Sequence, residues 1–205
     1  MTTALHMTAA IVLSGGASSR MGRPKALLTR AGETFLAGIL RTLRDGGVAR
    51  IVVVTGVHHD VIAAHLAGDR TVPPATVVRN PDASGDQLSS LRAGLAALDA
   101  EPGLDAVLVA LVDHPLIDAG TVRALVREHD ASRAPVVRPE HGGRHGHPVL
   151  FGREAFEMLR HGDLPDGAKG VLRAFAAREV LVPVTNAGVL VDVDTPGDYR
   201  AIVEG

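Results

Sequence analysis

Residues 9–25 read AAIVLSGGASSRMGRPK, in which the apolar run Ala9–Leu13 passes directly into a loop rich in glycine and hydroxyl groups. The apolar run predicts a buried β-strand. Glycines at the carboxyl end of a strand let backbone N–H groups approach phosphate oxygens closely. The loop has neither the GKS or GKT ending of a Walker loop nor the GxGxxG spacing of a dinucleotide-binding loop. The stretch therefore predicts a phosphate-binding loop of a different kind, and the alternative is a glycine-rich surface turn with a solvated Lys25.

The cations of this loop suit a triphosphate. Lys25 offers a mobile positive charge that can neutralise the α-phosphate while pyrophosphate leaves, and Arg20 adds further donors. Together with Asp113, which follows a later strand, they are the predicted catalytic residues. The loop residues predicted to bind the nucleotide are Leu13, Ser14, Gly15, Gly16, Ser18, Ser19, Gly22 and Lys25.

Beyond the loop, short branched-apolar runs alternate with segments of helical periodicity. Apolar residues from Phe35 to Leu43 recur at helical spacing, and the glycines at 46 and 47 predict the end of that helix. The further predicted strands are Ile51–Thr55, Thr76–Arg79 and Ala106–Val112; the further predicted helices are Asp60–Leu66, a helix through Leu98 capped by Ser89 or Ser90, and Thr121–Glu128 capped by Asp118. This alternation predicts right-handed βαβ crossovers, and hence an α/β fold with a mainly parallel sheet.

The alternation of predicted strands and helices ends after about residue 135. Val136–Arg138 and Pro148–Phe151 flank a loop rich in glycine and histidine, which predicts a hairpin-like excursion instead of another crossover. Predicted strands at Glu179–Val184 and Val189–Val191 and a helix from Thr195 follow. Because no repeat or linker interrupts the chain, we expect a single domain over residues 8–205 and a flexible segment over residues 1–7, in which Met7 is an alternative start to Met1.

Two acidic segments fall where strands are predicted to end, and open parallel sheets bind ligands at that edge. Asp113 ends one strand, where a carboxylate suits Mg²⁺ that bridges phosphates; the alternative is that it caps the following turn. Alternation places Asp192 and Asp194 on one face of an extended segment, where they repel each other unless a cation or donors lie between them. Asp113 and Asp192 are the predicted metal ligands. The alternative for Asp194 is support of the helix that Thr195 caps.

Two further polar segments complete the predicted site. Residues 80–90, NPDASGDQLSS, enter a helix and suit recognition of a base or ribose, with Asn80, Gln87, Ser89 and Ser90 as the predicted contacts. Residues 142–148, GGRHGHP, can present a histidine and backbone donors to an acceptor molecule. The predicted acceptor contacts are His114, Gly146 and His147.

Composition narrows the possible partners. The 205 residues carry a formal net charge of −2, and only 2% of them are aromatic, so the chain has neither the basic footprint nor the stacking surface of a nucleic-acid-binding protein. The absence of cysteine excludes disulfides and thiolate catalysis. No run approaches the roughly 20 apolar residues that span a bilayer. We therefore expect a cytoplasmic protein with neither nucleic acid nor membrane as partner.

The loop 13–25 closely resembles the signature of the nucleotidyltransferases that complete the molybdenum cofactor, a branch of the sugar-nucleotidyltransferase superfamily. The cytidylyltransferase type is the most similar, because four later segments resemble its segments in the same order. These are GDQLSSLRAG at 85–94, VDHPL at 112–116, GHPVLF at 146–151 and DVDTP at 192–196. The resemblance spans about Ala9 to Ile202, nearly the whole chain.

This resemblance implies a Rossmann-like, three-layer α/β/α nucleotidyltransferase fold. It implies a triphosphate in the Gly-rich loop, Lys25 as the main phosphate cation, Mg²⁺ as cofactor at Asp113, and Asp192 as a second metal or acceptor contact. The implied reaction moves a nucleotidyl group from an NTP, with CTP favoured over GTP, to the phosphate of molybdopterin, and a molybdenum enzyme is the implied partner. Gly15, which is nearer the guanylyltransferase form, keeps GTP open. His114, where the branch often has Gln, keeps other acceptors open.

Two other classes of function compete with this interpretation. One is a non-catalytic accessory protein that binds nucleotide or cofactor for a molybdenum dehydrogenase, and it predicts nucleotide binding without turnover. The other is an NAD(P)H-dependent oxidoreductase on the same scaffold. The loop lacks the dinucleotide spacing, and no acid lies about 20 residues further on to bind a ribose, so the sequence favours the transferase.

Overall fold

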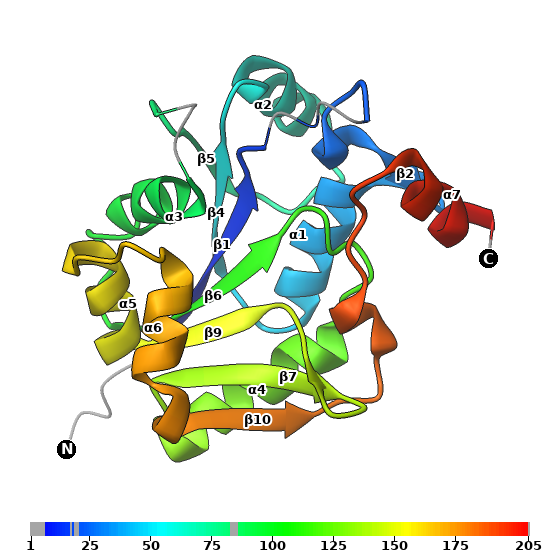
Figure 1. Ribbon diagram of the computed structural model, residues 1–205. Helices are drawn as coiled ribbons and strands as arrows, with labels where there is room; N and C mark the ends of the chain where they lie inside the picture. Colours follow the sequence, from blue (N-terminus) through cyan, green and yellow to red (C-terminus); the bar gives the residue numbers. More distant parts are fainter. Residues whose placement is uncertain (1–6, 17, 19–20, 83–85, 205) are drawn as a thin grey trace.

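A twisted sheet runs through the centre of the computed structural model, which describes residues 7–16, 18, 21–82 and 86–204 (Figure 1). Its strands follow the order β10-β7-β9-β6-β1-β4-β5, and β8 pairs with β7. The bounds are β1 (Met7–Ser14), β4 (Arg50–Thr55), β5 (Thr76–Arg79), β6 (Leu104–Leu111), β7 (Val136–His141), β8 (Arg144–His145), β9 (Val149–Gly152) and β10 (Glu179–Pro183). The predicted α/β class is confirmed.

Helices cover both faces of this sheet, and a small hairpin lies beside it (Figure 1). The α-helices are α1 (Phe35–Asp45), α2 (His59–Gly68), α3 (Gln87–Ala96), α4 (Ala119–Ser132), α5 (Arg153–His161), α6 (Ala168–Ala174) and α7 (Pro196–Glu204). The 3-10 helices are η1 (Lys25–Leu27), η2 (Ala176–Arg178) and η3 (Ala187–Leu190), and the hairpin pairs β2 (Thr29–Arg30) with β3 (Glu33–Thr34).

The parallel part of the sheet places the loop after β1 beside the end of β6. β1 pairs in parallel with both β4 and β6, and Leu13 lies level with Val54 on one side and Leu111 on the other. All three strands therefore end at the same edge of the sheet. The predicted phosphate loop and Asp113 both begin at this edge, which is where open parallel sheets bind ligands.

Strand alternation divides the core into two apolar clusters, one on each face of the sheet. Ala10 and Val12 of β1 pack with α1, α2 and α4, while Ala9, Ile11 and Leu13 pack with α3, α5 and α6. The β1 residues in these clusters are almost completely buried, with Leu13 the most exposed at 7%. Because successive strand side chains point to opposite faces, a branched apolar strand needs helices on both sides. The three-layer arrangement follows from this.

A third, smaller apolar cluster joins the chain's last helix to the segment after the Gly-rich loop. Leu28, Phe35 and Val193 are buried in it, and Met21, Tyr199 and Ile202 pack against them. The Tyr199 hydroxyl donates to the Thr29 carbonyl at 2.7 Å, which ties α7 to β2. The C-terminal segment is therefore packed against the chain that carries Lys25, away from the two large clusters (Figure 1).

The excursion predicted after residue 135 is confirmed, since β9 runs antiparallel to both β6 and β7. The structure corrects three details. The predicted strand Val189–Val191 is wrong, because residues 187–190 form η3. The cap of α3 is Asp86, whose carboxylate accepts the Ser89 N–H, and neither Ser89 nor Ser90 is the cap. Met7, expected in the flexible N-terminal segment, is the first residue of β1.

The helices α5 and α6 were not predicted, although the segment at 153–161 has the spacing of an amphipathic helix, with Ala155, Phe156 and Leu159 buried. None of the helices in the described part of the chain is long and apolar enough to cross a membrane.

Candidate active site

A polar cavity of about 430 Å³ opens over the carboxyl ends of β1, β4 and β6. It extends from Lys25 and Asp194 on one side to the ends of β4 and β5 and the start of α3 on the other. Of the predicted site residues, Leu13, Ser14, Gly15, Gly16, Ser18, Lys25, Asn80, Gln87, Ser90 and Asp113 line it. Segments far apart in the sequence thus meet in one space, as the sequence predicts.

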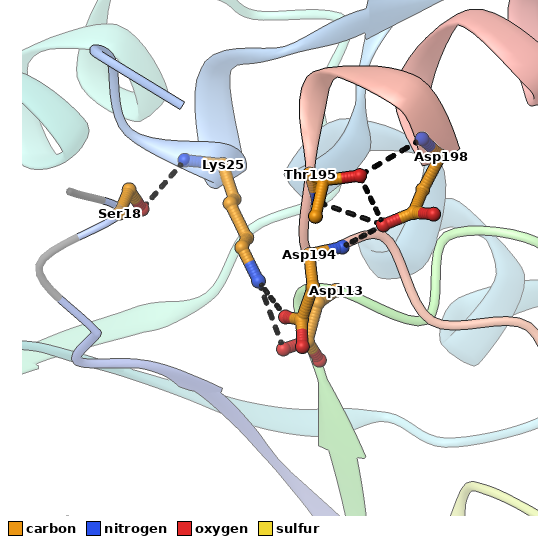
Figure 2. Close-up of polar contacts among 6 residues, drawn as sticks. All are labelled: Ser18, Lys25, Asp113, Asp194, Thr195 and Asp198. Atoms are coloured by element: carbon orange, nitrogen blue, oxygen red, sulfur yellow. Dashed lines mark hydrogen bonds and ion pairs between the residues drawn. The ribbon is translucent and has the colours of Figure 1, made fainter. Parts of the chain in front are cut away.

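Lys25 lies between two carboxylates at one end of this cavity, which we call the charged end (Figure 2). Its Nζ is 3.3 Å from Asp113 Oδ2 and 2.5 Å from Asp194 Oδ1. The lysine side chain is 14% exposed, whereas the two aspartates are 30% and 46% exposed. Its backbone N–H donates to Ser18 Oγ at 3.1 Å, so the Gly-rich loop and the lysine are joined directly. Lys25 and Asp113, which the sequence assigns to one site, are therefore in contact in the structure.

The neighbourhood of Asp113 suits a divalent cation. Its Oδ1 is buried and has no hydrogen-bond partner among the described residues, while Oδ2 contacts Lys25. The described ranges contain no group of three or more His, Asp or Glu side chains arranged to hold a metal. Magnesium, however, is commonly bound by one or two carboxylates together with substrate phosphates. An unsatisfied carboxylate oxygen beside a second carboxylate fits an ion of that kind.

Of the two aspartates in the C-terminal segment, Asp194 is the one in contact with Lys25, while Asp192 is exposed. The role suggested for Asp194, support of the α7 N-terminus, belongs instead to Thr195 and Asp198. Thr195 Oγ1 accepts the Asp198 N–H at 3.2 Å, and Asp198 Oδ2 accepts from the Thr195 hydroxyl and N–H. These bonds, with a further one from the Asp194 N–H, lower the pKa of Asp198. The predicted cap, Thr195, is confirmed.

The opposite end of the cavity is formed by a hydrogen-bonded group around Asn80. Its side-chain amide donates to Ser89 Oγ at 2.9 Å and to Ser90 Oγ at 3.0 Å, and its Oδ1 accepts the Asp82 N–H. A Cβ on Gly15 would lie 3.0 Å from Ser90 Oγ, which is tight enough to displace that hydroxyl. The residue at position 15 is therefore coupled to the group that faces this end of the cavity.

The predicted acceptor residues lie together beside the charged end, outside the lining of the cavity. The rings of His114 and His147, which we call the histidine pair, have centroids 4.6 Å apart. Burial, opposed by the charge of Asp113 and of the two later aspartates, lowers the pKa of His114. Burial, with the charges of His114 and Arg138, lowers the pKa of His147 to about 4. Neither Nδ1 atom has a hydrogen-bond partner among the described residues, so both rings have unused hydrogen-bonding capacity.

Gly146 allows the loop of the histidine pair to press against η3. A Cβ at this position would lie 2.5 Å from the Val189 carbonyl oxygen, and the neighbouring His147 N–H donates to that same oxygen at 2.9 Å. The glycine is needed for this approach, because backbone atoms cannot move aside as a flexible side chain can. Gly146 thus fixes the place of His147 without lining the cavity.

Other predicted residues have different outcomes. Ser19 and Arg20 lie outside the described residues. Gly22, Ser89 and Asp192 are described but do not line the cavity. Lining residues that sequence reasoning did not single out as contacts are Met21, Pro24, Gly56, His58, Ile62, Asp82, Asp86, Leu111, Val112 and Asp194. Asp82 and Asp86 belong to the polar stretch 80–90, and His58 follows the end of β4, so the rule that ligands bind at strand ends could have found them.

A site at this edge of an open sheet, with glycine-rich backbone on one side and carboxylates on the other, is typical of nucleotide-binding α/β proteins. The chain belongs to the MobA-like NTP transferase family, whose domain matches residues 10–180. By family it is thus an NTP nucleotidyltransferase, and membership of this family implies an NTP as substrate.

Individual relatives are distant. Nicotine blue oxidoreductase of Paenarthrobacter nicotinovorans is 31% identical over 94% of this chain and 95% of its own. The molybdenum cofactor cytidylyltransferase of Escherichia coli K12 is 23% identical, with 92% of each chain covered. The solved structure of Rv0371c from Mycobacterium tuberculosis H37Rv has a TM-score of 0.77 at 26% identity, over 99% of this chain and 100% of that one. The same protein has been solved in complex with manganese, at a TM-score of 0.71 and 25% identity over 97% of this chain and 99% of that one.

Proposed function

We propose that this protein transfers a nucleotidyl group from an NTP, CTP in preference to GTP, to the phosphate of the molybdenum cofactor, molybdopterin, and releases pyrophosphate. The observation that carries the proposal is the position of Lys25, held between Asp113 and Asp194 at the end of a cavity lined by the Gly-rich loop. The full-length similarity to a molybdenum cofactor cytidylyltransferase supports this acceptor and CTP.

Charge determines how the nucleotide lies in the cavity. The charged end carries the ammonium of Lys25 beside the carboxylates of Asp113 and Asp194, which would hold Mg²⁺. The described lining of the opposite end carries the carboxylates of Asp82 and Asp86 and the amides of Asn80 and Gln87, and it includes neither lysine nor arginine. A triphosphate is attracted by the ammonium of Lys25 and by the divalent cation that the charged end would hold, while a base can donate N–H groups to carboxylates and accept from amides. We therefore place the phosphates along the Gly-rich loop toward Lys25, and the base beside Asn80.

Each polar group at the charged end then has a task in the transfer. An oxygen of the acceptor phosphate bonds to the α-phosphorus, and the bond from that phosphorus to the leaving pyrophosphate breaks. Lys25 neutralises the negative charge that accumulates on the α-phosphate oxygens. Asp113, with Asp192 or Asp194 as a second carboxylate, would hold Mg²⁺, which supplies additional charge neutralisation on the phosphates. Contact with Lys25 favours Asp194 as that second carboxylate.

The acceptor is placed beside the histidine pair, because His114 directly follows Asp113 in the chain. Two neutral imidazoles with unused Nδ1 atoms can exchange hydrogen bonds with a polar heterocycle without bringing further charge to the site. Positioning of this kind contributes to rate by holding the acceptor in line with the α-phosphorus.

The direct test is pyrophosphate release from each NTP with Mg²⁺ and molybdopterin. We expect turnover by the wild type and a loss of about 100-fold or more in Lys25→Ala and in Asp113→Ala, the size typical for removal of one charge-stabilising group. Lys169→Ala is the matched control, since Lys169 is exposed and is the only other lysine in the sequence. Wild-type turnover in both site variants would reject the proposed site. Nucleotide binding by the wild type without turnover would favour the accessory-protein alternative.

The second candidate is an NAD(P)H-dependent oxidoreductase, which the similarity to nicotine blue oxidoreductase over 94% of this chain favours. The loop 13–25 lacks the spacing that places a helix N-terminus against a dinucleotide pyrophosphate. A fluorescence titration with NADPH distinguishes the two functions. Saturable binding at micromolar concentration that CTP and GTP fail to displace would support the oxidoreductase, and the absence of binding would remove it.

A further inference from the structure

The turn that leads into α7 is held by one carboxylate oxygen. Asp198 Oδ2 accepts three hydrogen bonds: from the Asp194 N–H at 3.0 Å, the Thr195 N–H at 2.7 Å and the Thr195 hydroxyl at 2.8 Å (Figure 2). Thr195 Oγ1 in return accepts the Asp198 N–H at 3.2 Å. Charge-assisted hydrogen bonds of this kind are stronger than those between neutral groups. The backbone from Asp194 to Asp198 is therefore closed into a fixed loop.

This loop includes the residue whose carboxylate contacts Lys25. Asp194 donates its N–H to Asp198, and its Oδ1 lies 2.5 Å from Lys25 Nζ. On the other side of Asp194, the Val193 N–H donates to the Asp113 carbonyl at 2.8 Å, and the Val193 side chain is completely buried. The backbone of Asp194 is thus anchored both before and after it, by Asp113 and by Asp198.

We infer that Asp198 is a positioning residue of the nucleotide site, which acts through Asp194 to hold Lys25 at the charged end. The inference rests on the proposed function for its consequence in catalysis, but the placement of Lys25 can be tested without any nucleotide. The simpler alternative is that Asp198 only stabilises the first turn of α7, in which case its loss leaves Lys25 unaffected.

The chain offers a direct probe, because Lys25 and Lys169 are its only lysines. Trace acetylation followed by mass spectrometry gives the ratio of labelling at Lys25 to labelling at Lys169. Lys25 is 14% exposed and paired with two carboxylates, whereas Lys169 is exposed, so this ratio is low in the wild type. We expect Asp198→Ala to raise the ratio several-fold. Asp198→Asn should raise the ratio less than Asp198→Ala does, because the amide oxygen keeps an acceptor at this position but lacks the charge that strengthens the bonds.

A double-mutant cycle separates positioning from plain structural support. Asp194→Ala should raise the labelling ratio by itself, and adding Asp198→Ala to it should change the ratio no further, since the path through Asp194 is already broken. An unchanged ratio in Asp198→Ala, or an equal rise in the presence and absence of Asp194, would overturn the inference. Thermal melts check that each variant folds. If Asp198→Ala does not fold, Thr195→Val against Thr195→Ser poses the same question, with a raised ratio expected only in the valine variant.

The same variants report on catalysis. If the proposed function is correct, Asp198→Ala lowers kcat/KM for pyrophosphate release about tenfold in the wild-type background and has no effect in the Asp194→Ala background. Asp198→Asn should lose less activity than Asp198→Ala. If the wild type shows no turnover with any NTP, the proposed function fails, while the labelling ratios still decide the role of Asp198.

Discussion

The charged end and the histidine pair are joined at adjacent residues, Asp113 and His114, but charge is handled in opposite ways in the two regions. At the charged end an ammonium and two carboxylates, all partly accessible, compensate one another. In the histidine pair, burial suppresses charge and leaves both Nδ1 atoms without partners among the described residues. At the charged end a divalent cation can replace Lys25 as the counter-charge of the two carboxylates. In the histidine pair, burial disfavours protonation of both rings.

The largest expected loss of activity concerns the two aspartates of the C-terminal segment, Asp192 and Asp194. We expect Asp194→Ala to lower kcat/KM for nucleotidyl transfer about 100-fold, because it removes a carboxylate in contact with Lys25. Asp192→Ala, at an exposed position two residues earlier, should cost about threefold or less. Steady-state pyrophosphate release measures both. A larger loss in Asp192→Ala would move the second carboxylate to Asp192.

For the histidine pair, the expected effect is acid sensitivity of folding. His147 takes up a proton near pH 4 in the folded protein but near pH 6.5 in the unfolded chain. Between these values the unfolded chain binds more protons, so the free energy of unfolding falls as the pH is lowered from about 6.5 to 4, by about 3 kcal/mol. Urea titrations across this range measure the slope. His147→Gln should flatten it and His161→Gln, an exposed control, should not; equal slopes in all three proteins would contradict a buried neutral His147.

A smaller expected effect is on metal affinity, and it tests whether a divalent cation can replace Lys25 as the counter-charge of Asp113 and Asp194. Without nucleotide, Lys25 compensates the carboxylates that a divalent cation would use, so Lys25→Met should bind Mn²⁺ about tenfold more tightly than the wild type. Lys169→Met is the control, and calorimetry in the absence of NTP gives the affinities. Weaker Mn²⁺ binding in Lys25→Met would mean that the lysine and the metal do not share these carboxylates.

The smallest expected effect concerns the choice of base. Gly15→Ala pushes against Ser90 Oγ and so disturbs its bond with Asn80, whereas Gly16→Ala has no atom within 4 Å of the added Cβ. We expect Gly15→Ala to change the ratio of CTP to GTP affinity about threefold, with Gly16→Ala unchanged. A change of equal size in both variants would mean that position 15 has no specific role in base recognition.

Most of the parallel strands β1, β4, β5 and β6 could be predicted, because their branched apolar sequences favour strands and the same residues are buried in the folded core. Strand β5 matches its predicted range, and the loop after β1 reaches Asp113 because both follow strands that end at one edge. The C-terminal half was less predictable. The helix α5 directly follows β9, at a point where the pattern predicts only the end of an excursion. Val189 and Val191 are β-branched, which favours a strand, yet residues 187–190 form the 3-10 helix η3.

The charged end illustrates what pattern alone leaves undecided. Alternation groups Asp192 with Asp194, yet side-chain contact with Lys25 depends on how the turn after Asp194 is closed, by a carboxylate four residues further on. A cap by Thr195 is visible in the sequence, but three bonds to one oxygen of Asp198 depend on the exact path of the backbone. The role of a residue that closes such a turn can be recognised only in the three-dimensional structure.

Lys25, in contact with Asp113 and Asp194, is proposed here as the residue that binds the phosphates of the nucleotide. Thermal or chemical unfolding in the presence of CTP, GTP, ATP or UTP with Mg²⁺ tests it most directly, because a ligand at one hundred times its dissociation constant stabilises by about 2.7 kcal/mol. We expect such stabilisation of the wild type and of Lys169→Met by at least one NTP, and at least a tenfold weaker affinity in Lys25→Met. Equal stabilisation of Lys25→Met would contradict it.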